Sequence, residues 1–318
     1  MGRRTLLTGA AGLLGGACAR RLLERGDEVI ALVRDRDPRA SLYADGLVER
    51  CVEVRAELSD APRLLAEYAP DAVVHLAAPT QVPVAARAPL STFESNLRGT
   101  WLLLEACRVA PRPPQALVVA STDKVYGPAP VPYVEDGPLL ASAPYDVSKL
   151  CAELITRSYA ESLGLPAVIT RCGNLYGPGD LNFERLVPGV CRALLEGRAP
   201  ELRSRGAMTR EWLFVDDAAE ATLLLLDHAP ALRGQVFNVG GEERATAGEL
   251  AERLRAIAAD AGLTPEPIRF AEADPPGEIP HQALHSGRLR ALGWAPKRRL
   301  DDALPETFAW FRGILQRP

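Results

Sequence analysis

Three glycines at a spacing of three residues follow the first apolar segment of the chain. Residues 5–8 predict a short buried strand, and residues 16–25 predict a helix. Between them stand Gly9, Gly12 and Gly15. Glycines in such a turn allow a tight bend and let the backbone approach a pyrophosphate, which the helix N-terminus also attracts. A glycine-rich turn without a ligand has the same spacing, so the interpretation depends on the segments that come after the turn.

Apolar segments and helical patterns alternate through the first half of the chain. Strands that alternate with helices predict an α/β fold, a doubly wound parallel Rossmann sheet with right-handed crossovers. Ligands of such sheets bind at the carboxyl ends of the strands. Because the glycine turn is the first of this series, we interpret it as a dinucleotide site. The further strands are expected at residues 28–33, 51–54, 72–76, 116–120 and 167–171, and the helices at residues 61–68 and 93–108.

The composition is that of a soluble globular protein. Of 318 residues, 47% are hydrophobic and 25% charged, and the net charge is −4, which argues against nucleic-acid and polybasic membrane partners. No segment approaches the roughly 20 apolar residues of a membrane span. The six cysteines form no C-x-x-C pair and none lies beside histidine at metal-ligand spacing. We therefore expect no metal site, reduced thiols and a cytoplasmic location.

The end of the second strand bears on the choice of dinucleotide. A carboxylate there commonly binds the ribose 2′-OH of NAD, whereas an arginine accommodates the 2′-phosphate of NADP. This chain has both, as Arg34 and Asp35, so the sequence leaves NAD and NADP open. Asp60 follows the third strand and is a candidate to bind the adenine amine. Capping the helix that begins at residue 61 is an equally good role for it.

Groups suited to proton transfer follow the fifth strand. Thr122, Asp123 and Lys124 come at its end, and Tyr145 and Lys149 stand four residues apart at the start of a helical pattern. That spacing puts the phenol and the ammonium group on one helix face. A free tyrosine titrates near ~10, so ionisation near neutral pH needs a positive neighbour such as Lys149. On spacing alone, Asp123 and Lys124 are equally consistent with a local ion pair.

These motifs resemble those of the extended short-chain dehydrogenase/reductases. Within that group the sequence is most similar to the nucleotide-sugar 4,6-dehydratases, and among these to the CDP-glucose 4,6-dehydratases. The resemblance covers nearly the whole chain, which is shorter than is usual and departs from the family pattern at residues 78–80 and 286–288. The motifs that carry it are Asn96 and residues 8–15, 75–78, 121–127, 145–149, 171–174, 179–182 and 277–282.

The resemblance implies an NAD(P)-dependent lyase that acts on a nucleoside-diphosphate (NDP) hexose. Thr122 would hold the hydroxyl at C4 of the sugar, and Tyr145, assisted by Lys149, would accept its proton. After oxidation at C4, Asp123 would act as the acid and Lys124 as the base that remove water across C5 and C6. A hydride would then return to C6 and leave a 4-keto-6-deoxy sugar.

The resemblance also assigns binding residues and an assembly. The nucleotide sugar would contact Asn174, Asn182, Arg210 and His281, and residues 277–282 would close over it. A homodimer would form through the helices at residues 93–108 and 145–162. The cofactor contacts would be Gly9, Gly12, Leu13, Leu14, Gly15, Arg34, Asp60, Leu76, Ala77, Ala78, Asn96, Tyr145 and Lys149.

Two alternatives remain open. An NDP-sugar 4-epimerase needs Thr122, Tyr145 and Lys149 but no acid–base pair. A non-catalytic NAD(P)-binding regulator would keep the glycines and lose the tyrosine–lysine pair, which this chain retains. We interpret His75, at the end of an apolar strand, as structural or adjacent to the cofactor.

The second half of the chain breaks the alternation with turn-rich and proline-rich segments. Thr246 and Glu249 predict a helix capping box. We expect a cofactor-binding lobe of residues 1–173 plus about 211–240. A smaller, discontinuous C-terminal substrate-binding lobe would comprise residues 174–210 plus about 241–318. The expected elements are helices at residues 185–196, 216–227 (capped by Asp216), 247–259, 289–294 and 305–315, and strands at residues 212–215 and 235–239.

Overall fold

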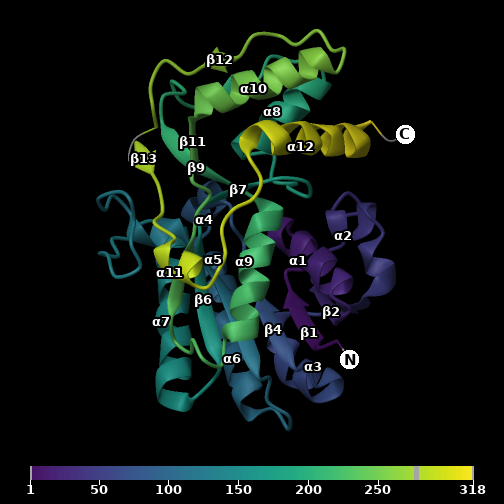
Figure 1. Cartoon of the computed structure of the whole chain (residues 1–318), viewed down its shortest axis with the longest axis vertical. Helices are drawn as coiled ribbons and strands as arrows, with labels where there is room; N and C mark the ends of the chain where they lie inside the picture. The colour runs from purple at the N-terminus through teal and green to yellow at the C-terminus, as the bar shows by residue number, and fades with distance from the viewer. Residues whose placement is uncertain (1, 276–278, 317–318) are drawn as a thin grey trace.

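A sheet of seven parallel strands forms the larger part of the molecule (Figure 1). The computed structural model describes residues 2–275 and 279–316. The strand order β10-β6-β5-β4-β1-β2-β3 confirms the doubly wound α/β fold predicted from the alternation of strands and helices. The strands are β1 Arg4–Thr8, β2 Glu28–Val33, β3 Val52–Arg55, β4 Ala72–His75, β5 Ala116–Thr122, β6 Ala167–Cys172 and β10 Val236–Val239.

Two apolar layers cover the sheet, because successive side chains of a strand point to opposite faces. In β1, Leu7 packs with α1 and α9, whereas Leu6 packs on the other face with α3, α6 and α7. Burial of each such leucine stabilises the fold by about 2 kcal/mol. The helices are α1 Leu13–Glu24, α3 Ala61–Tyr68, α6 Gly99–Val109, α7 Pro144–Leu163 and α9 Val215–His228.

The helix predicted at residues 93–108 is divided. A π-helical turn, η3 Glu94–Arg98, separates α5 Pro89–Phe93 from α6. Within this turn the side chain of Thr100 donates to the carbonyl oxygen of Asn96 at 2.6 Å. Such turns are frequent at functional sites, because they displace one side chain from the regular helix face. Here the displaced position is occupied by the buried Asn96.

A smaller lobe is built from the second half of the chain. Its four-stranded sheet has the order β11-β9-β13, with β7 also paired to β9, and helices α8, α10 and α12 pack around one apolar core. Thr246 and Glu249 make the predicted capping box of α10. The elements are β7 Asn174–Tyr176, β8 Glu201–Leu202, β9 Thr209–Phe214, β11 Glu243–Thr246, β12 Arg269–Phe270, β13 His281–Gln282, α8 Leu186–Leu195, α10 Ala247–Asp260 and α12 Leu300–Leu315.

Two predicted helix starts are wrong. Asp216 does not cap α9, which already begins at Val215; its carboxylate instead accepts two hydrogen bonds from Arg21, at 2.9 and 2.6 Å. Helix α12 begins at Leu300 rather than at Pro305. Proline favours the first turn of a helix, but burial of Leu300 and its neighbours in the small-lobe core extends α12 toward the N-terminus.

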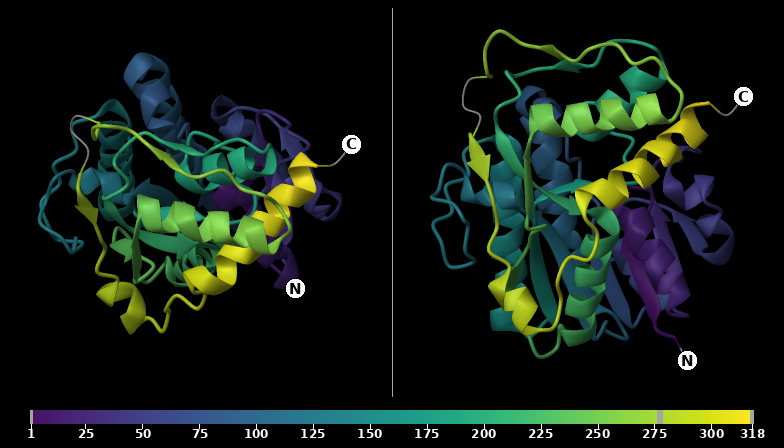
Figure 2. Two further views of the ribbon diagram at one scale, coloured as in Figure 1. Left: turned by 90° about the horizontal axis from the view of Figure 1, so that it is seen from above. Right: turned by 45° about the horizontal axis from the view of Figure 1, so that its top comes forward.

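The C-terminal segment connects the two sheets. Figure 2 shows it running from the small lobe past β13 to the short helix α11, which lies beside the main sheet. Leu284 on this segment bridges to Tyr133. No helix within residues 2–275 and 279–316 is long and apolar enough to cross a membrane. The remaining short elements are α2 Ser41–Ala44, η1 Leu47–Arg50, η2 Leu58–Asp60, α4 Val82–Arg87, η4 Asp123–Tyr126 and α11 Gly287–Ala291.

Candidate active site

The carboxyl end of β5 presents the polar groups that the sequence predicted there. Thr122 and Asp123 are buried, and the Thr122 hydroxyl donates to Asp123 Oδ1 at 3.1 Å. The backbone N–H of Lys124 donates to the same hydroxyl at 3.3 Å. Within the described residues no ion pair joins Asp123 to Lys124, which weakens the interpretation of these two residues as a local ion pair.

The first turns of α7 bring a phenol and an ammonium group to the same place. Tyr145 and Lys149 are buried, and Lys149 Nζ donates to the carbonyl oxygen of Ala120 at 2.8 Å. Burial lowers the pKa of Lys149 to about 8. Burial raises the pKa of Tyr145, with Asp123 adding to the rise, while a hydrogen bond with Thr122 opposes it. The site thus brings together four of the five predicted catalytic residues. The fifth, Lys124, lines a neighbouring cavity that is described below.

A cavity of about 420 Å³ lies at the glycine turn. It is lined by Gly9 and Gly12, by Arg34 at the end of β2, and by Ala77 and Ala78 after β4. Gly9 has φ +71°, and a Cβ there would lie 2.8 Å from the backbone N of Ala77. A Cβ on Gly15 would lie 2.0 Å from the Gly9 carbonyl oxygen. The glycines therefore keep open a cradle that fits a dinucleotide, at the strand ends where such ligands bind.

Several predicted cofactor residues do not line this cavity. Asn96 is buried and donates to the Ser148 hydroxyl at 2.9 Å, which ties the π turn to α7. Asp60 does not line the cavity; its Oδ2 accepts a hydrogen bond from the Glu57 backbone at 3.0 Å, in a capping box of η2. Asp60 makes no side-chain hydrogen bond that caps α3, so the predicted cap of the helix at residue 61 is wrong, because the carboxylate is engaged by the preceding turn instead. The predicted cofactor contacts Leu13, Leu14, Gly15 and Leu76 do not line the cavity either.

His75 is held in a chain of buried hydroxyls. Its Nδ1 lies 2.8 Å from Thr8 Oγ1 and its Nε2 lies 3.1 Å from Thr100 Oγ1. Thr8 Oγ1 also accepts hydrogen bonds from the backbone of Leu76 and Ala77, both at 3.2 Å. Burial lowers the pKa of His75 to about 3, so the ring is neutral. His75 joins β1, β4 and α6, as its structural interpretation predicted.

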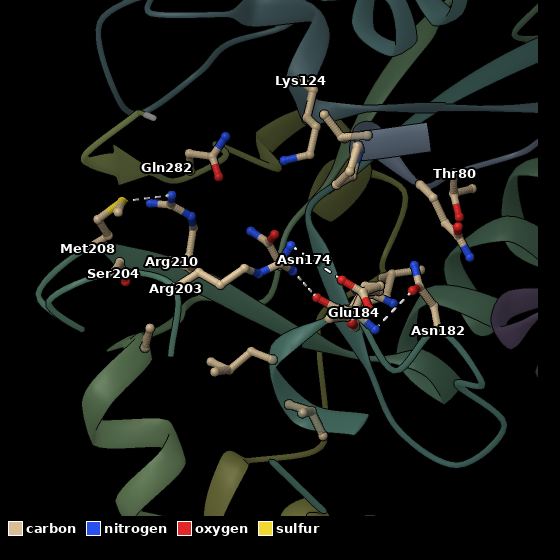
Figure 3. A pocket seen from close by; sticks show the side chains of 18 of the residues that line it. Thr80, Lys124, Asn174, Asn182, Glu184, Arg203, Ser204, Met208, Arg210 and Gln282 are labelled. Carbon is tan, nitrogen blue, oxygen red and sulfur yellow. Dashed lines mark hydrogen bonds and ion pairs between the residues drawn. The ribbon is translucent and has the colours of Figure 1, made fainter. Parts of the chain in front are cut away.

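A second cavity, of about 720 Å³, lies between the main sheet and the small lobe. Lys124, Asn174, Asn182 and Arg210 all line it, so the predicted base and three of the predicted substrate contacts meet in one space (Figure 3). Two further arginines, Arg185 and Arg203, line it as well, whereas Arg205 does not. In this structure Arg185 is paired with Asp180 and Arg203 with Glu184, and guanidinium groups are suited to bidentate hydrogen bonds with a diphosphate.

The predicted contact His281 is exposed and does not line this cavity. Its neighbour Gln282 lines it instead and is only 3% exposed. Both belong to the two-residue strand β13, in which His281 pairs with Thr209 and Gln282 with Arg210. Because adjacent strand residues point to opposite faces, a prediction displaced by one residue selects the wrong side chain. Residues 277 and 278, also predicted to close over the substrate, lie outside the described residues.

Sequence reasoning also missed Asp146, which lines the same cavity directly after Tyr145. Burial raises the pKa of Asp146 to about 6, Lys124 opposes the rise and Asp123 adds to it. An acidic residue in the first turn of a helix is common, because it interacts favourably with the helix dipole. The sequence therefore contains no separate signal that this carboxyl group faces a ligand site.

Comparisons with known proteins place this geometry among sugar-nucleotide enzymes. The model of the NAD dependent epimerase/dehydratase family matches residues 5–240. The dTDP-glucose 4,6-dehydratase 1 of Escherichia coli (strain K12) is 31% identical over 337 residues, covering 97% of this chain and 92% of that protein. A UDP-glucose 4-epimerase of Mycolicibacterium smegmatis is 34% identical over 323 residues, covering 98% of this chain and 100% of that protein.

Among solved structures, a dTDP-glucose 4,6-dehydratase from Streptomyces venezuelae with NAD bound has a TM-score of 0.85 and 33% identity, covering 97% of each chain. The dehydratases in these comparisons are named for dTDP-glucose. They therefore support the dehydratase class implied by the sequence, but not specifically its CDP-glucose member. With the family match over most of its length, the glycine cradle and the tyrosine–lysine pair, this chain is an enzyme that belongs to the NAD-dependent epimerase/dehydratase family.

Proposed function

We propose that this enzyme is an NDP-hexose 4,6-dehydratase. The observation that carries the proposal is the pair Asp123 and Lys124 at the end of β5. Asp123 is buried beside the Thr122 hydroxyl, Lys124 extends into the larger cavity, and the two are not paired with each other. An epimerase has no use for an acid and a base at this place, whereas a dehydratase needs both.

Thr122, Tyr145 and Lys149 begin the reaction. Thr122 orients the C4 hydroxyl of the hexose, and Tyr145 accepts its proton. A bound NAD would supply the acceptor for the hydride of C4 and the donor of that hydride to C6. Burial raises the pKa of Tyr145 and the hydrogen bond with Thr122 opposes the rise, so positive charge brought close to the phenol would lower the pKa further. Lys149, now hydrogen-bonded to Ala120, is the residue able to supply that charge.

Asp123 and Lys124 then remove water from the 4-keto sugar. The C5 proton is acidic beside the ketone, and Lys124 takes it as a base. Asp123 donates a proton to the C6 hydroxyl as that group leaves. Lys124 must be neutral to act as a base.

We propose NAD rather than NADP as the cofactor. Arg34 Nε lies 2.6 Å from Asp35 Oδ2, and both residues line the cofactor cavity. The ion pair engages the arginine that a 2′-phosphate would need, and Asp35 brings to the cavity a carboxylate of the kind that accepts from a 2′-OH. The relative from Streptomyces venezuelae, which has the same fold, was solved with NAD.

The substrate class is an NDP-hexose whose base remains to be identified. Arg185, Arg203 and Arg210 support diphosphate binding in the larger cavity. The dehydratase relatives favour dTDP-glucose, and the sequence resemblance favours CDP-glucose. Incubation of the purified enzyme with NAD and each of these sugars tests the proposal: a 4-keto-6-deoxy product supports it.

A 4-epimerase is the second candidate, favoured by the 34% identity to the Mycolicibacterium smegmatis UDP-glucose 4-epimerase. It would use Thr122, Tyr145 and Lys149 in the same first step and leave Asp123 and Lys124 without a role. Interconversion of UDP-glucose and its C4 epimer, without loss of water, would favour this candidate.

We also propose a homodimer in the cytoplasm. Trp101 on α6 and Leu154 on α7 are 37% and 53% exposed, respectively. Large apolar side chains exposed on helices are suited to pairing with a second copy. The six cysteines are free thiols, which fits a reducing compartment.

A further inference from the structure

Two residues that line the larger cavity each carry a buried side-chain oxygen without a hydrogen-bond partner. Within the described residues, nine buried side-chain polar atoms have no hydrogen-bond partner. Two of these nine, Asp146 Oδ1 and Gln282 Oε1, belong to residues that line the larger cavity, and none belongs to a residue that lines the smaller one. Because an unpaired buried oxygen destabilises a protein, both atoms are suited to accept hydrogen bonds from a ligand.

These oxygens come from separate parts of the molecule. Asp146 is in the first turn of α7, one residue after the catalytic phenol of Tyr145. Gln282 is on β13 of the small lobe. Figure 3 shows the Gln282 amide and the Lys124 ammonium group directed into the same space. A molecule in this cavity that contacts both residues therefore also lies beside Lys124.

The surroundings of Gln282 hold its amide in place. Gln282 is 3% exposed and pairs in register with Arg210 of β9. A buried side chain on a paired strand has few alternative rotamers, so little conformational freedom is lost when it binds a ligand. The adjacent His281 is exposed and outside the cavity, so its side chain has no such role.

The charges of the cavity indicate which part of the substrate these oxygens meet. Arg185, Arg203 and Arg210 bring positive charge to one part of the cavity, where Asp180 pairs with Arg185 and Glu184 with Arg203. A carboxylate such as Asp146 repels a diphosphate but accepts hydrogen bonds from hydroxyls. The amide of Gln282 can accept from a hydroxyl or donate to it. These two residues therefore suit the neutral, hydroxyl-bearing end of the substrate.

We propose that Asp146 and Gln282 bind hydroxyl groups of the hexose and determine which sugars the enzyme accepts. This inference rests on the proposed function, because a hexose must occupy the larger cavity. A site whose buried polar groups are completed by substrate hydroxyls rejects analogues that lack them, since the protein groups are then left unpaired.

Calorimetric titration of the NAD-loaded enzyme with dTDP-glucose and with free dTDP separates hexose binding from diphosphate binding. Gln282→Met keeps the side-chain length and removes both polar atoms, and Asp146→Leu removes both carboxylate oxygens at a similar side-chain size. Each variant should bind dTDP-glucose about tenfold more weakly, as expected for one lost hydrogen bond, and should bind dTDP as the wild type does. His281→Ala, on the opposite face of β13, is the matched control and should change neither affinity.

Equal affinities of wild type and both variants for dTDP-glucose would overturn the inference while leaving the dehydratase proposal intact. Equal weakening for dTDP-glucose and dTDP would also overturn it, because the two residues would then shape the cavity rather than touch the hexose. If the wild type bound none of dTDP-glucose, CDP-glucose and UDP-glucose, the proposed function itself would fail, and this inference with it.

Discussion

At the scale of single residues, Asp123 decides between water elimination and simple oxidation. In Asp123→Asn, the amide cannot give a proton to the leaving C6 hydroxyl, so water loss should slow by at least ~100-fold. Oxidation at C4 depends on Thr122 and Tyr145 and should continue. Stopped-flow absorbance of the reduced cofactor and quenched-flow product analysis resolve the two steps. Asp136→Asn, on an exposed loop, is the control; an equal loss of both steps in Asp123→Asn would contradict the acid role.

Asp146 gives a second prediction at this scale, for stability against pH. Its pKa of about 6 in the folded protein lies above the ordinary 3.8. Between these values the folded protein binds more protons than the unfolded chain, so stability falls as pH rises through this window. The cost in stability of burying the ionised carboxylate is absent below pH 3.8 and complete above about pH 6. Raising the pH from about 4 to about 7 should therefore destabilise the wild type relative to Asp146→Asn by about 1 kcal/mol, given partial solvent exposure.

Urea denaturation of both proteins at several pH values measures this difference. A difference in the free energy of unfolding that stays constant across the pH range would contradict the prediction.

Asp146 also illustrates what sequence reasoning can and cannot find. The glycine turn and the tyrosine–lysine pair are recognisable because their chemistry fixes their spacing. Asp146 and Gln282 have no such fixed spacing. An acidic residue such as Asp146 is common at a helix start, and the two-residue strand that contains Gln282 is too short to show an alternation of apolar and polar residues.

At the scale of elements, α7 is anchored by a buried ion pair. Arg171 Nη2 lies 2.7 Å from Glu153 Oε2, both side chains are at most 3% exposed, and Arg171 also donates to Tyr126 OH at 2.8 Å. Glu153→Gln leaves Arg171 buried and uncompensated, so it should lower the free energy of unfolding by about 3 kcal/mol. Arg157→Gln breaks an exposed pair on the same helix and should cost less than about 0.5 kcal/mol. Similar losses in the two variants, measured by urea denaturation, would contradict this account.

The main-sheet strands could be predicted because each is a continuous apolar run buried on both faces. The small lobe could not, because β8, β12 and β13 have two residues each and exist only through pairing with distant strands. The pairing of β13 with β9 alone decides that Gln282, and not His281, faces the cavity. Likewise β9, partly assigned by sequence to the cofactor lobe, pairs with β7, β11 and β13.

At the scale of the whole molecule, the end of the catalytic strand β5 and the small lobe both border the larger cavity. We propose that the boundary between the two lobes follows this arrangement, with β9 in the substrate-binding lobe.

The proposed dimer gives a prediction at this scale. Leu154→Arg places a charge on the exposed apolar surface of α7 and should yield monomers in sedimentation velocity experiments. A monomeric wild type, or a variant that sediments as the wild-type dimer does, would contradict the α7 interface.

The acid–base role of Asp123 and Lys124 is the central claim, and proton exchange at C5 tests it most directly. The wild-type enzyme is incubated with NAD and dTDP-glucose or CDP-glucose in heavy water, and the product is examined by NMR. We predict a 4-keto-6-deoxy hexose that carries deuterium at C5, because Lys124 exchanges the proton it removes with solvent. A C4 epimer with no deuterium at C5 would contradict the account.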